Sequence, residues 1–424
     1  MIKECTLGDC VETIIDYRGK TPQKMGGDWA DIGYRVVSAL NVHDGFIDNE
    51  DQIRCVSQEI YDKWMKDEIK RNDCFLASEG ASLGENTIWD SDEKIVLGQR
   101  LYAIRTNSDK LDPWYFAMYM QTKKFRQQIN QISTGSTVFG ISQPTLLGVK
   151  LLLPNIVEQR KIGALYRNIY RKIKNNISIC SDLESIAKTI YNYWFLQFEF
   201  PNEDGKLYKS SGGKMVWNEE LKREIPDGWL VRNISDLCAL GNGINYDKKA
   251  TGDKTYKIVN VRDISASSLL INKQDMNEIS LPSTLANKYL VNKNDILIAR
   301  SGTPGAVRLV LDTDNVIYCG FIIHCLPNDF EHRFYLTFTL KLYEGTSATK
   351  TGGSILQNVS QDTLKSLTIP LPSKNVLSSF NAKIKPLIDK MQLCIEENNQ
   401  LASLRDFLLP MLMNGQVTFK EVDE

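Results

Sequence analysis

The chain has 424 residues, of which 24% are charged and 42% hydrophobic, and its formal net charge is −1. This length indicates two or three domains rather than one core, and the mixture of apolar and charged residues excludes a disordered chain. No run of about 18 to 20 apolar residues predicts a membrane helix, and the first residues lack the order of a signal peptide. We therefore expect a cytoplasmic protein whose basic character, if any, is confined to local loops.

Nine cysteines and three histidines are scattered along the chain, and no two cysteines form a C-x-x-C pair. The spacing predicts neither a disulfide framework nor a zinc site. We expect reduced thiols that pack as small hydrophobic side chains.

An internal repeat dominates the sequence. At an offset of 222 residues, YRVVSALNV (34–42) aligns with YKIVNVRDI (256–264), DCFLASEG (73–80) with DILIARSG (295–302), and Gly98 with Gly320. At an offset of 218, residues 133–154 align with 351–372, and eight of these 22 pairs are identical. We place the four-residue difference between Leu101 and Ser133. Two long copies predict two homologous domains, not a solenoid.

Each copy is predicted to mix helices and strands. DCFLAS and DILIAR are short apolar runs that favour buried strands, and VKLLLP and LTIPLP favour terminal strands that end at a proline. Residues 113–129 have apolar positions near helical spacing. The expected fold class is therefore α+β.

A long helix is predicted after each copy. The first starts with Asn155 as N-cap and Glu158 three residues later. Both helices have apolar residues at alternating steps of four and three, and each seam contains one asparagine, which favours pairing as a coiled coil. Pro386 should kink or delay the second helix. The alternative is two ordinary amphipathic core helices. The first seam is Ile162, Tyr166, Ile169, Ile173, Asn176, Cys180, Leu183, Ala187 and Ile190, and the second is Phe380, Ile384, Leu387, Met391, Cys394, Asn398, Leu401, Arg405 and Leu408.

Between the copies, residues 202–229 are rich in glycine, serine and charge, which is typical of a linker.

The sequence contains no convincing catalytic motif. Gly19, Lys20 and Thr21 match the end of a P-loop, but Ile14 occupies the position of its first glycine. No proline follows asparagine or another proline, so the N/D-P-P-aromatic loop of DNA amino-methyltransferases is absent. A loose nuclease pattern, Pro226–Asp227 with Asp247–Lys248–Lys249, starts inside the predicted linker.

Polar, glycine-bearing basic loops recur at matching places in the two copies. Hydroxyl groups and backbone N–H groups suit phosphate oxygens, and arginine, lysine and glutamine can reach base edges. A solvated turn is the alternative for any single loop. The predicted DNA-binding residues are Arg18, Lys20, Lys24, Ser78, Lys248, Lys249, Arg300, Ser301, Lys350 and Ser354.

Over essentially its whole length the chain resembles the specificity subunit (HsdS) of type I restriction-modification systems. The resemblance rests on YNYWFLQFEFP (191–201), GKLYKSSGGKMVWNEELKREIPDGW (205–229), LRDFLLPMLMNGQV (404–417) and the two segments ISQPTLLGVKLLLP and VSQDTLKSLTIPLP. It implies two target recognition domains, 1–154 and 229–372, separated by two long helices, 155–200 and 373–415, that form an antiparallel coiled coil. Residues 201–228 would be a linker and 416–424 a tail.

The resemblance also implies a non-catalytic protein whose domains each read one half of a split double-stranded DNA site. The helices would dock two methyltransferase subunits, which hold S-adenosylmethionine, and restriction subunits would join that core. No cofactor or metal is expected in this chain. The predicted docking positions are Ile169, Ile173, Leu183, Ile190, Leu387, Met391, Leu401 and Leu408.

Two other hypotheses stay open at this point. The repeat and the helices would equally suit a protein scaffold that binds no nucleic acid. A nuclease would use Asp227, Asp247 and Lys249. If mutation of Asp247 caused no loss of cleavage, the nuclease hypothesis would be excluded.

Overall fold

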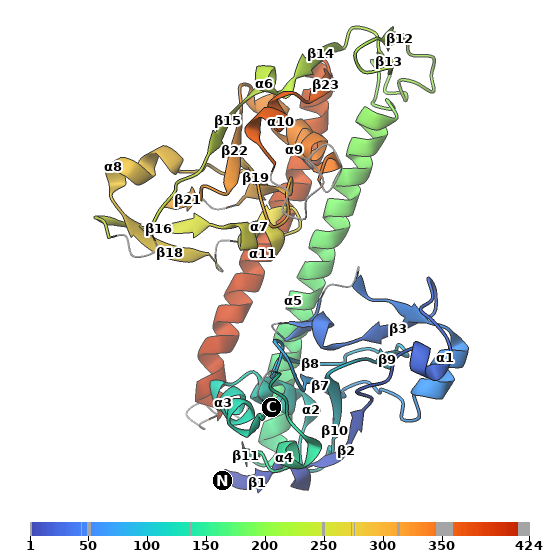
Figure 1. Ribbon diagram of the computed structural model, residues 1–424, viewed down its shortest axis with the longest axis vertical. Helices are drawn as coiled ribbons and strands as arrows, with labels where there is room; N and C mark the ends of the chain where they lie inside the picture. Colours follow the sequence, from blue (N-terminus) through green and yellow to red (C-terminus); the bar gives the residue numbers. More distant parts are fainter. Residues whose placement is uncertain are drawn as a thin grey trace, which may run out of the picture. The chain divides into compact units, whose positions relative to one another are not determined.

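The computed structural model describes residues 2–413, apart from residues 44, 49–51, 136–137, 248–250, 273, 275, 312–313 and 345–358. The chain divides into two compact units, Met1–Asn175 with Gln400–Glu424, and Asn176–Asn399. These units differ from the predicted domain bounds because each long helix contributes one part to each unit. Figure 1 labels their helices and strands.

The first unit is built on a four-stranded antiparallel sheet in the order β2-β10-β7-β8, and the strand β1 pairs with β11 beside it. A small sheet, β6-β3-β9, adds a parallel pair, β3 with β9. The strands are β1 (Lys3–Thr6), β2 (Val11–Asp16), β3 (Tyr34–Val37), β4 (Val42–His43), β5 (Phe46–Ile47), β6 (Cys55–Val56), β7 (Cys74–Ala77), β8 (Asn86–Ile88), β9 (Val96–Leu97), β10 (Leu101–Thr106) and β11 (Lys150–Leu153). The helices before the long one are α1 (Gln58–Trp64), α2 (Pro113–Met120), α3 (Lys123–Ile132) and α4 (Gln143–Leu147).

The second unit repeats this plan with a five-stranded sheet, β15-β22-β19-β20-β17, a three-stranded sheet, β18-β16-β21, and the pair β14-β23. The strands are β14 (Leu230–Asn233), β15 (Cys238–Asn242), β16 (Lys254–Val259), β17 (Leu270–Ile271), β18 (Asn277–Leu281), β19 (Ile296–Ala299), β20 (Val307–Val310), β21 (Val316–Tyr318), β22 (Ile322–Pro327) and β23 (Thr368–Leu371). The helices are α6 (Ile234–Leu237), α7 (Val261–Ser265), α8 (Ser283–Ala286), α9 (Arg333–Leu342) and α10 (Gln361–Lys365).

The backbone hydrogen bonds of the two units confirm the duplication. Strand β7 pairs with β10 as β19 pairs with β22, and the predicted strands at DCFLAS, DILIAR, VKLLLP and LTIPLP all form. Ser142 caps α4 and Ser360 caps α10 through the same contact, a serine hydroxyl that accepts the N–H of a threonine three residues on. Because local caps and pairing agree, the two copies share one fold down to single turns.

The predicted alignment is wrong by one residue after the turn that follows β7. Trp89 N–H donates to the Asp73 carbonyl, and the matching bond in the second unit comes from Val310, at an offset of 221. The glycine-flanked turn is one residue shorter in the second copy, Gly302–Gly305 against Gly80–Gly84. Gly98 therefore corresponds to Cys319. The remaining three residues of the four-residue difference between the two copies lie between this point and Ile141.

The helical pattern predicted over 113–129 forms two helices, α2 and α3, instead of one. Thr122 interrupts it, because its hydroxyl caps α3 by accepting the N–H of Phe125 at 3.1 Å. Every residue of α2 after Pro113 is buried in the core of the first unit.

The first long helix, α5 (Ile156–Tyr191), begins as predicted, with the Asn155 side chain accepting the N–H of Glu158 at 2.9 Å. It continues as one π-turn over Asn192–Leu196. The second, α11 (Lys374–Met413), starts well before Pro386, so the predicted delay is wrong. Pro386 and Ala382 are both exposed, and the Ala382 carbonyl lacks its helical partner because proline has no N–H.

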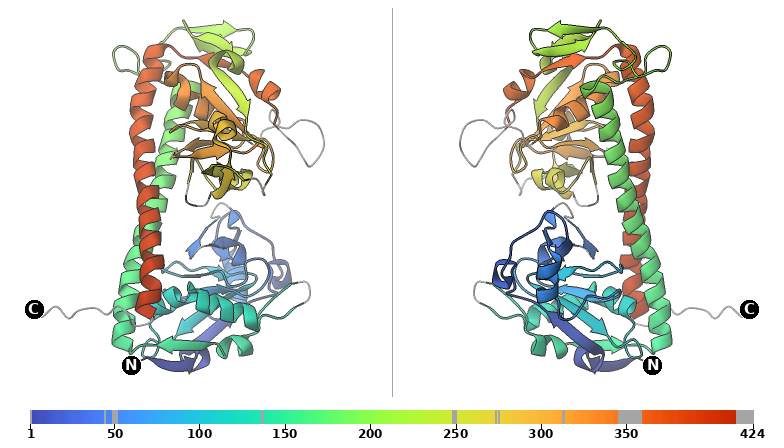
Figure 2. Two further views of the ribbon diagram at one scale, coloured as in Figure 1. Left: turned by 90° about the vertical axis from the view of Figure 1, so that its left-hand side faces the viewer. Right: turned by 90° about the vertical axis from the view of Figure 1, so that its right-hand side faces the viewer.

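The two long helices pair within the second unit, where one hydrophobic cluster joins Ala187 and Tyr191 of α5 to Phe380, Ile384 and Met391 of α11. Figures 1 and 2 both draw these segments side by side. The pairing is antiparallel, because residues later in α5 contact residues earlier in α11. Asn176, with 1% of its surface exposed, donates to the side chain of Asn398 at 2.9 Å. The two predicted seam asparagines thus contact each other directly.

The predicted seam is only approximate in α11. Ile388 is fully buried where Leu387 was expected, and Leu387 is half-buried beside it. In the first unit Leu409 and Leu412 pack with Ile162 and Tyr166, whereas Leu408 is only partly buried. An α-helix has 3.6 residues per turn, so a repeat of 3.5 drifts around a helix that is not supercoiled to match.

The segment predicted as a linker is folded, which corrects that prediction. The strands β12 (Met215–Asn218) and β13 (Arg223–Pro226) form an antiparallel hairpin. Phe200 and Trp229 are buried in the core of the second unit, and Phe200 also stacks on Tyr208 with ring centroids 4.6 Å apart. Composition alone missed this because a few aromatic anchors outweigh many polar residues in burial energy. Across the described residues, none of the helices combines the length and apolarity that spanning a membrane requires.

Replacing Asn176 with alanine should lower the free energy of unfolding by about 1–3 kcal/mol, because the half-buried side chains of Asn398 and Glu397 lose the buried donor that they share. Replacing both asparagines with leucine should cost less than the single change or raise stability, since no amide is then left unpaired. Denaturant unfolding measures both, with the exposed Ser181→Ala as control. A double variant as unstable as Asn176→Ala would contradict the role of this contact.

Candidate nucleic-acid interface

One end of the central sheet gathers several loops in each unit. In the first unit the turn after β7 starts at Ser78, whose carbonyl accepts the N–H of Ile141 from the loop before α4. The loop after β2 joins it, because Arg18 donates to the Ile141 carbonyl at 3.3 Å. The predicted residues Arg18 and Ser78 therefore do come together, although they lie 60 residues apart in the sequence.

Arg18 is engaged inside the protein. Its guanidinium forms a bidentate contact with Asp16, with a shortest distance of 2.8 Å, and lies 4.5 Å from the centre of the Tyr102 ring. The hydrogen bond to Asp16 raises the pKa of Arg18, so the guanidinium keeps its charge. Arg18 thus orders the loop and offers little free charge to a phosphate.

The two lysines of the same loop differ. Lys20 donates its ammonium to the Trp64 carbonyl at 2.9 Å and lies over the Tyr17 ring, and burial lowers its pKa. Lys24 is exposed and donates to the Gly19 carbonyl at 2.7 Å, which leaves further N–H groups for solvent or a ligand. Of the two, Lys24 is the better candidate for a phosphate contact.

Ser78 is fully buried, and its hydroxyl has no hydrogen-bond partner within the described residues. The loop before α4 covers it, so the structure removes Ser78 from the predicted DNA-contacting set.

In the second unit, Arg300 and Ser301 occupy the same turn after β19. The Arg300 backbone accepts the N–H of Val359 and its side chain donates to the Gly320 carbonyl at 3.2 Å. Its Nε is buried without a partner in the described part of the chain, whereas Ser301 is half-buried. Lys248, Lys249, Lys350 and Ser354 lie outside the described residues.

The sequence reasoning missed exposed residues at this sheet end. The Arg100 side chain is 54% exposed and lies 3.9 Å from Glu79, Phe139 is 54% exposed, and Phe321 of the second unit is 62% exposed. Gly80 N–H donates to the Phe139 carbonyl, so this aromatic residue sits on the turn after β7. The alignment at a constant offset concealed that Arg100 and Phe321 share one backbone position.

A buried carboxylate fixes the start of the strand that leads to each turn. In the first unit Asp73 pairs bidentately with Arg105 at 2.7–2.8 Å, and in the second unit the equivalent Asp295 lies 3.0 Å from His324 Nε2 and 3.9 Å from Arg333. Both carboxylates also accept a backbone N–H from three residues earlier. The frame of the turn is thus kept while the partner of the carboxylate changes.

Comparison with known proteins agrees with this picture. Residues 226–402 match the family model described as the type I restriction modification DNA specificity domain. The type I restriction enzyme MjaIX specificity subunit of Methanocaldococcus jannaschii is 26% identical over 315 residues, which cover 73% of this chain and 70% of that protein. The HindI specificity subunit of Haemophilus influenzae is 21% identical over 407 residues, covering 83% and 88%.

The chain is thus similar to type I restriction-modification specificity subunits over most of its length, and residues 226–402 match the DNA specificity domain of that family. The fold agrees, because the crystal structure of a type I system S subunit from M. genitalium matches 100% of this chain and 97% of its own with a TM-score of 0.55, at 13% identity. The predicted resemblance to this family and the predicted fold class are both confirmed.

The long helices of this specificity subunit carry two kinds of apolar residue. The predicted docking residues Ile169, Ile173 and Met391 are buried, while Leu183, Ile190, Leu387, Leu401 and Leu408 are half-buried. These residues mostly pack within the units, and their role in docking a partner stays a prediction. The exposed large apolar residues of α5 and α11 are Val157 (57%), Ile177 (50%), Ile179 (36%), Ile186 (48%), Leu393 (59%), Leu404 (44%) and Phe407 (61%).

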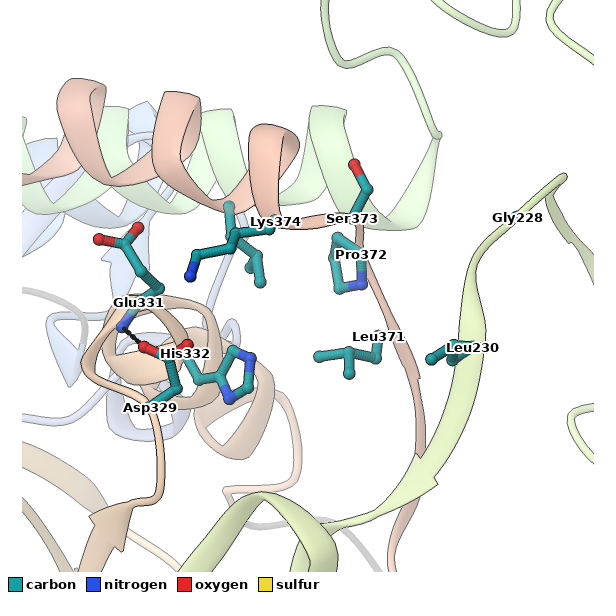
Figure 3. Close-up of a pocket in the computed structure, with 10 residues that line it drawn as sticks. Gly228, Leu230, Asp329, Glu331, His332, Leu371, Pro372, Ser373 and Lys374 are labelled. Carbon is teal, nitrogen blue, oxygen red and sulfur yellow. Dashed lines mark hydrogen bonds between the residues drawn. The ribbon is translucent and has the colours of Figure 1, made fainter.

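A pocket of about 250 Å³ lies at the start of α11 in the second unit of the specificity subunit (Figure 3). Lys374 and His332 line it together with the carboxylates of Asp329 and Glu331. Burial lowers the pKa of His332, so its ring is neutral at neutral pH. Because two acids line the pocket and none of the predicted DNA-binding residues does, we do not assign it to the interface.

The remaining nuclease residues are not assembled into a site. Asp227 forms an ion pair with Lys214 at 2.9 Å in the hairpin, and Lys249 lies outside the described residues. No group of three metal-ligating side chains occurs within the part of the specificity subunit that the structure describes.

Replacing Arg105 with alanine should lower the free energy of unfolding of the specificity subunit by about 3–5 kcal/mol, because Asp73 would stay buried without its cation. Arg333→Ala is the matched variant of the second unit and should cost less, since Asp295 keeps its contact with His324. Denaturant unfolding distinguishes the two, and equal losses would show that the two carboxylates do not differ in their dependence on arginine.

Proposed function

We propose that this chain is a DNA-specificity subunit without catalytic activity of its own, in which each unit reads one half of a two-part double-stranded DNA site. The observation that carries the proposal is the repeated sheet end. The same turn, loop and capped helix recur in both units and present different exposed side chains. Two readers with one frame and different surfaces suit an asymmetric site with two distinct halves.

The relatives support this proposal by name, since they are specificity subunits of type I restriction enzymes. A protein scaffold would explain the repeat and the helices, but it would not require an exposed aromatic side chain at the same sheet end of both copies, Phe139 in the first and Phe321 in the second. The loose nuclease pattern has no assembled site to support it.

We propose that methyltransferase subunits, which hold S-adenosylmethionine, dock on the exposed apolar residues of the long helices, and that restriction subunits join that assembly. Ile177, Ile186 and Leu393 all belong to the second unit and are about half exposed. Apolar side chains at such exposure favour a protein partner over water.

The decisive experiment maps modified bases in DNA after reaction with the complex of this chain and its methyltransferase subunits. The expected result is a single two-part consensus with an unspecified spacer. Modification without sequence preference would overturn the proposed function.

Reversing the charge of Lys24 should weaken DNA binding by the complex and reduce the slope of log K against log salt by about one, because one phosphate contact is lost. The consensus of both halves should stay unchanged, since phosphate contacts carry no direct sequence information. Lys63→Glu, on α1 of the same unit and paired only with Glu59 among the described residues, is the control. A changed consensus in both halves would contradict the two-reader proposal.

Replacing Ile186 with aspartate should reduce co-purification of the methyltransferase subunits by at least about tenfold, because a charge would be buried at an apolar interface. Ser185→Asp places the same charge on the adjacent, already polar position and should have little effect. Pull-down from cells that co-express the subunits measures the difference. Equal recovery with both variants would place the docking surface elsewhere.

A further inference from the structure

Two backbone positions are strictly equivalent between the units. Ser78 N–H donates to the Arg100 carbonyl at 2.9 Å, and Arg300 N–H donates to the Phe321 carbonyl at 2.9 Å. These bonds join the end of β7 to the residue before β10, and the end of β19 to the residue before β22. Arg100 and Phe321 therefore share one position, and Ser78 and Arg300 share the other.

The frame around these positions is the same in both units. The carbonyl of Ser78 accepts from Ile141, as that of Arg300 accepts from Val359. Two residues after each of them stands a glycine with positive φ, Gly80 at 84° and Gly302 at 74°. The hydrogen bonds of the turn are thus the same in both units while the side chains differ, although φ is positive at Arg100 and not at Phe321.

The two shared positions carry different types of side chain in the two units, and the arginine is at a different one of them in each unit. In the first unit Ser78 is buried and the arginine comes from position 100, whereas in the second unit the arginine comes from position 300 and an exposed phenylalanine occupies position 321. A large apolar side chain with 62% exposure is unusual beside a cation unless something covers it.

A second exchange lies next to the first. In the first unit Gly19 donates its N–H to the side chain of Gln99 at 3.2 Å. In the second unit the two residue types are exchanged: Gly320 occupies the position of Gln99, and the amide is that of Asn245. The two residues are so close that a Cβ added at Gly320 would lie 2.0 Å from Oδ1 of Asn245. The side-chain amide is thus supplied by one of the two adjacent loops in the first unit and by the other loop in the second unit. The surface chemistry differs while the pairing of the two loops is kept.

Arg100 also has a strained backbone, with φ at 60°. Residues with a Cβ pay for this left-handed conformation, which glycine adopts freely. Such outliers persist where the side chain has a use, and they gather at functional sites.

We propose that the shared position is specificity-determining, with Arg100 hydrogen-bonding a base edge in one half-site and Phe321 making an apolar contact in the other. Arginine suits the O6 and N7 acceptors of guanine, and phenylalanine suits the methyl group of thymine. This inference rests on the proposed function and deepens it by naming the residue and the base chemistry in each unit.

The test uses the complex with its methyltransferase subunits and a duplex library randomised over both half-sites. Arg100→Ala should reduce the preference at one base pair of one half-site by about 10- to 100-fold and leave the other half unchanged. Phe321→Ala should do the reverse. Arg126→Ala and Phe330→Ala, which remove exposed side chains of the same kinds in the same units, should leave both halves unchanged.

Two further variants separate base contact from phosphate contact and from misfolding. Arg100→Lys keeps the charge but loses the two-pronged donor, so it should relax the same base pair. Arg100→Gly removes the side chain and the strained φ together, so it should melt no lower than the wild type and still lose the preference.

The inference is overturned if Arg100→Ala lowers modification of all sequences equally while Arg100→Lys restores it, because that pattern is a phosphate contact. It is also overturned if the consensus of Arg100→Ala and Phe321→Ala equals that of the controls. In both cases a wild-type complex that still reads a two-part site leaves the proposed function standing. A wild type that reads no site overturns both.

Discussion

The contact between Asn176 and Asn398 is the constraint on which the helix pairing in the second unit depends. The apolar residues around it attract without direction, so they would tolerate several staggers of the two helices. The buried amide of Asn176, which donates to both Asn398 and Glu397 across the seam, does not, because any slip would leave a buried polar group unpaired. Each long helix follows one copy of the repeated fold. This contact therefore fixes the register in which the two long helices pair within the second unit.

The two units use one backbone to carry different surfaces. The buried carboxylates Asp73 and Asp295, the glycine turns and the serine caps of α4 and α10 are kept, and they fix the strands and loops that meet at the sheet end. Solvent-facing positions on that frame are free to vary, because their side chains add little to folding. Sequence recognition and stability are thereby assigned to different residues, even where they are neighbours in the chain.

Much of this fold could be predicted from the sequence, because its signals are local or repeated. The strand runs, the Asn155 cap and the seam asparagines follow from spacing and residue type. The single-residue difference between the turns after β7 and β19 could not be located from the sequence, because the glycines of the two turns align at either offset. The folded state of residues 201–229 was missed since a few buried aromatics, not the overall composition, determine it.

The candidate interface was predicted less well than the fold. Arg18 and Lys20 are cationic in the sequence, but Asp16 and the Trp64 carbonyl take up their donors. Such partners lie near in space and are not visible as a pattern. Arg100 and Phe321 were missed for the opposite reason, since neither belongs to a basic or glycine-rich loop and only the strand register reveals their equivalence.

The left-handed backbone at Arg100 also bears on how such a protein could change over time. Glycine there would relieve strain, so the simplest loss of the side chain carries no folding penalty. A lineage could pass through a stable, less discriminating form and then acquire another side chain on the same frame. Two copies that began with the same sequence can diverge in this way only if each intermediate protein remains folded while its exposed side chains change.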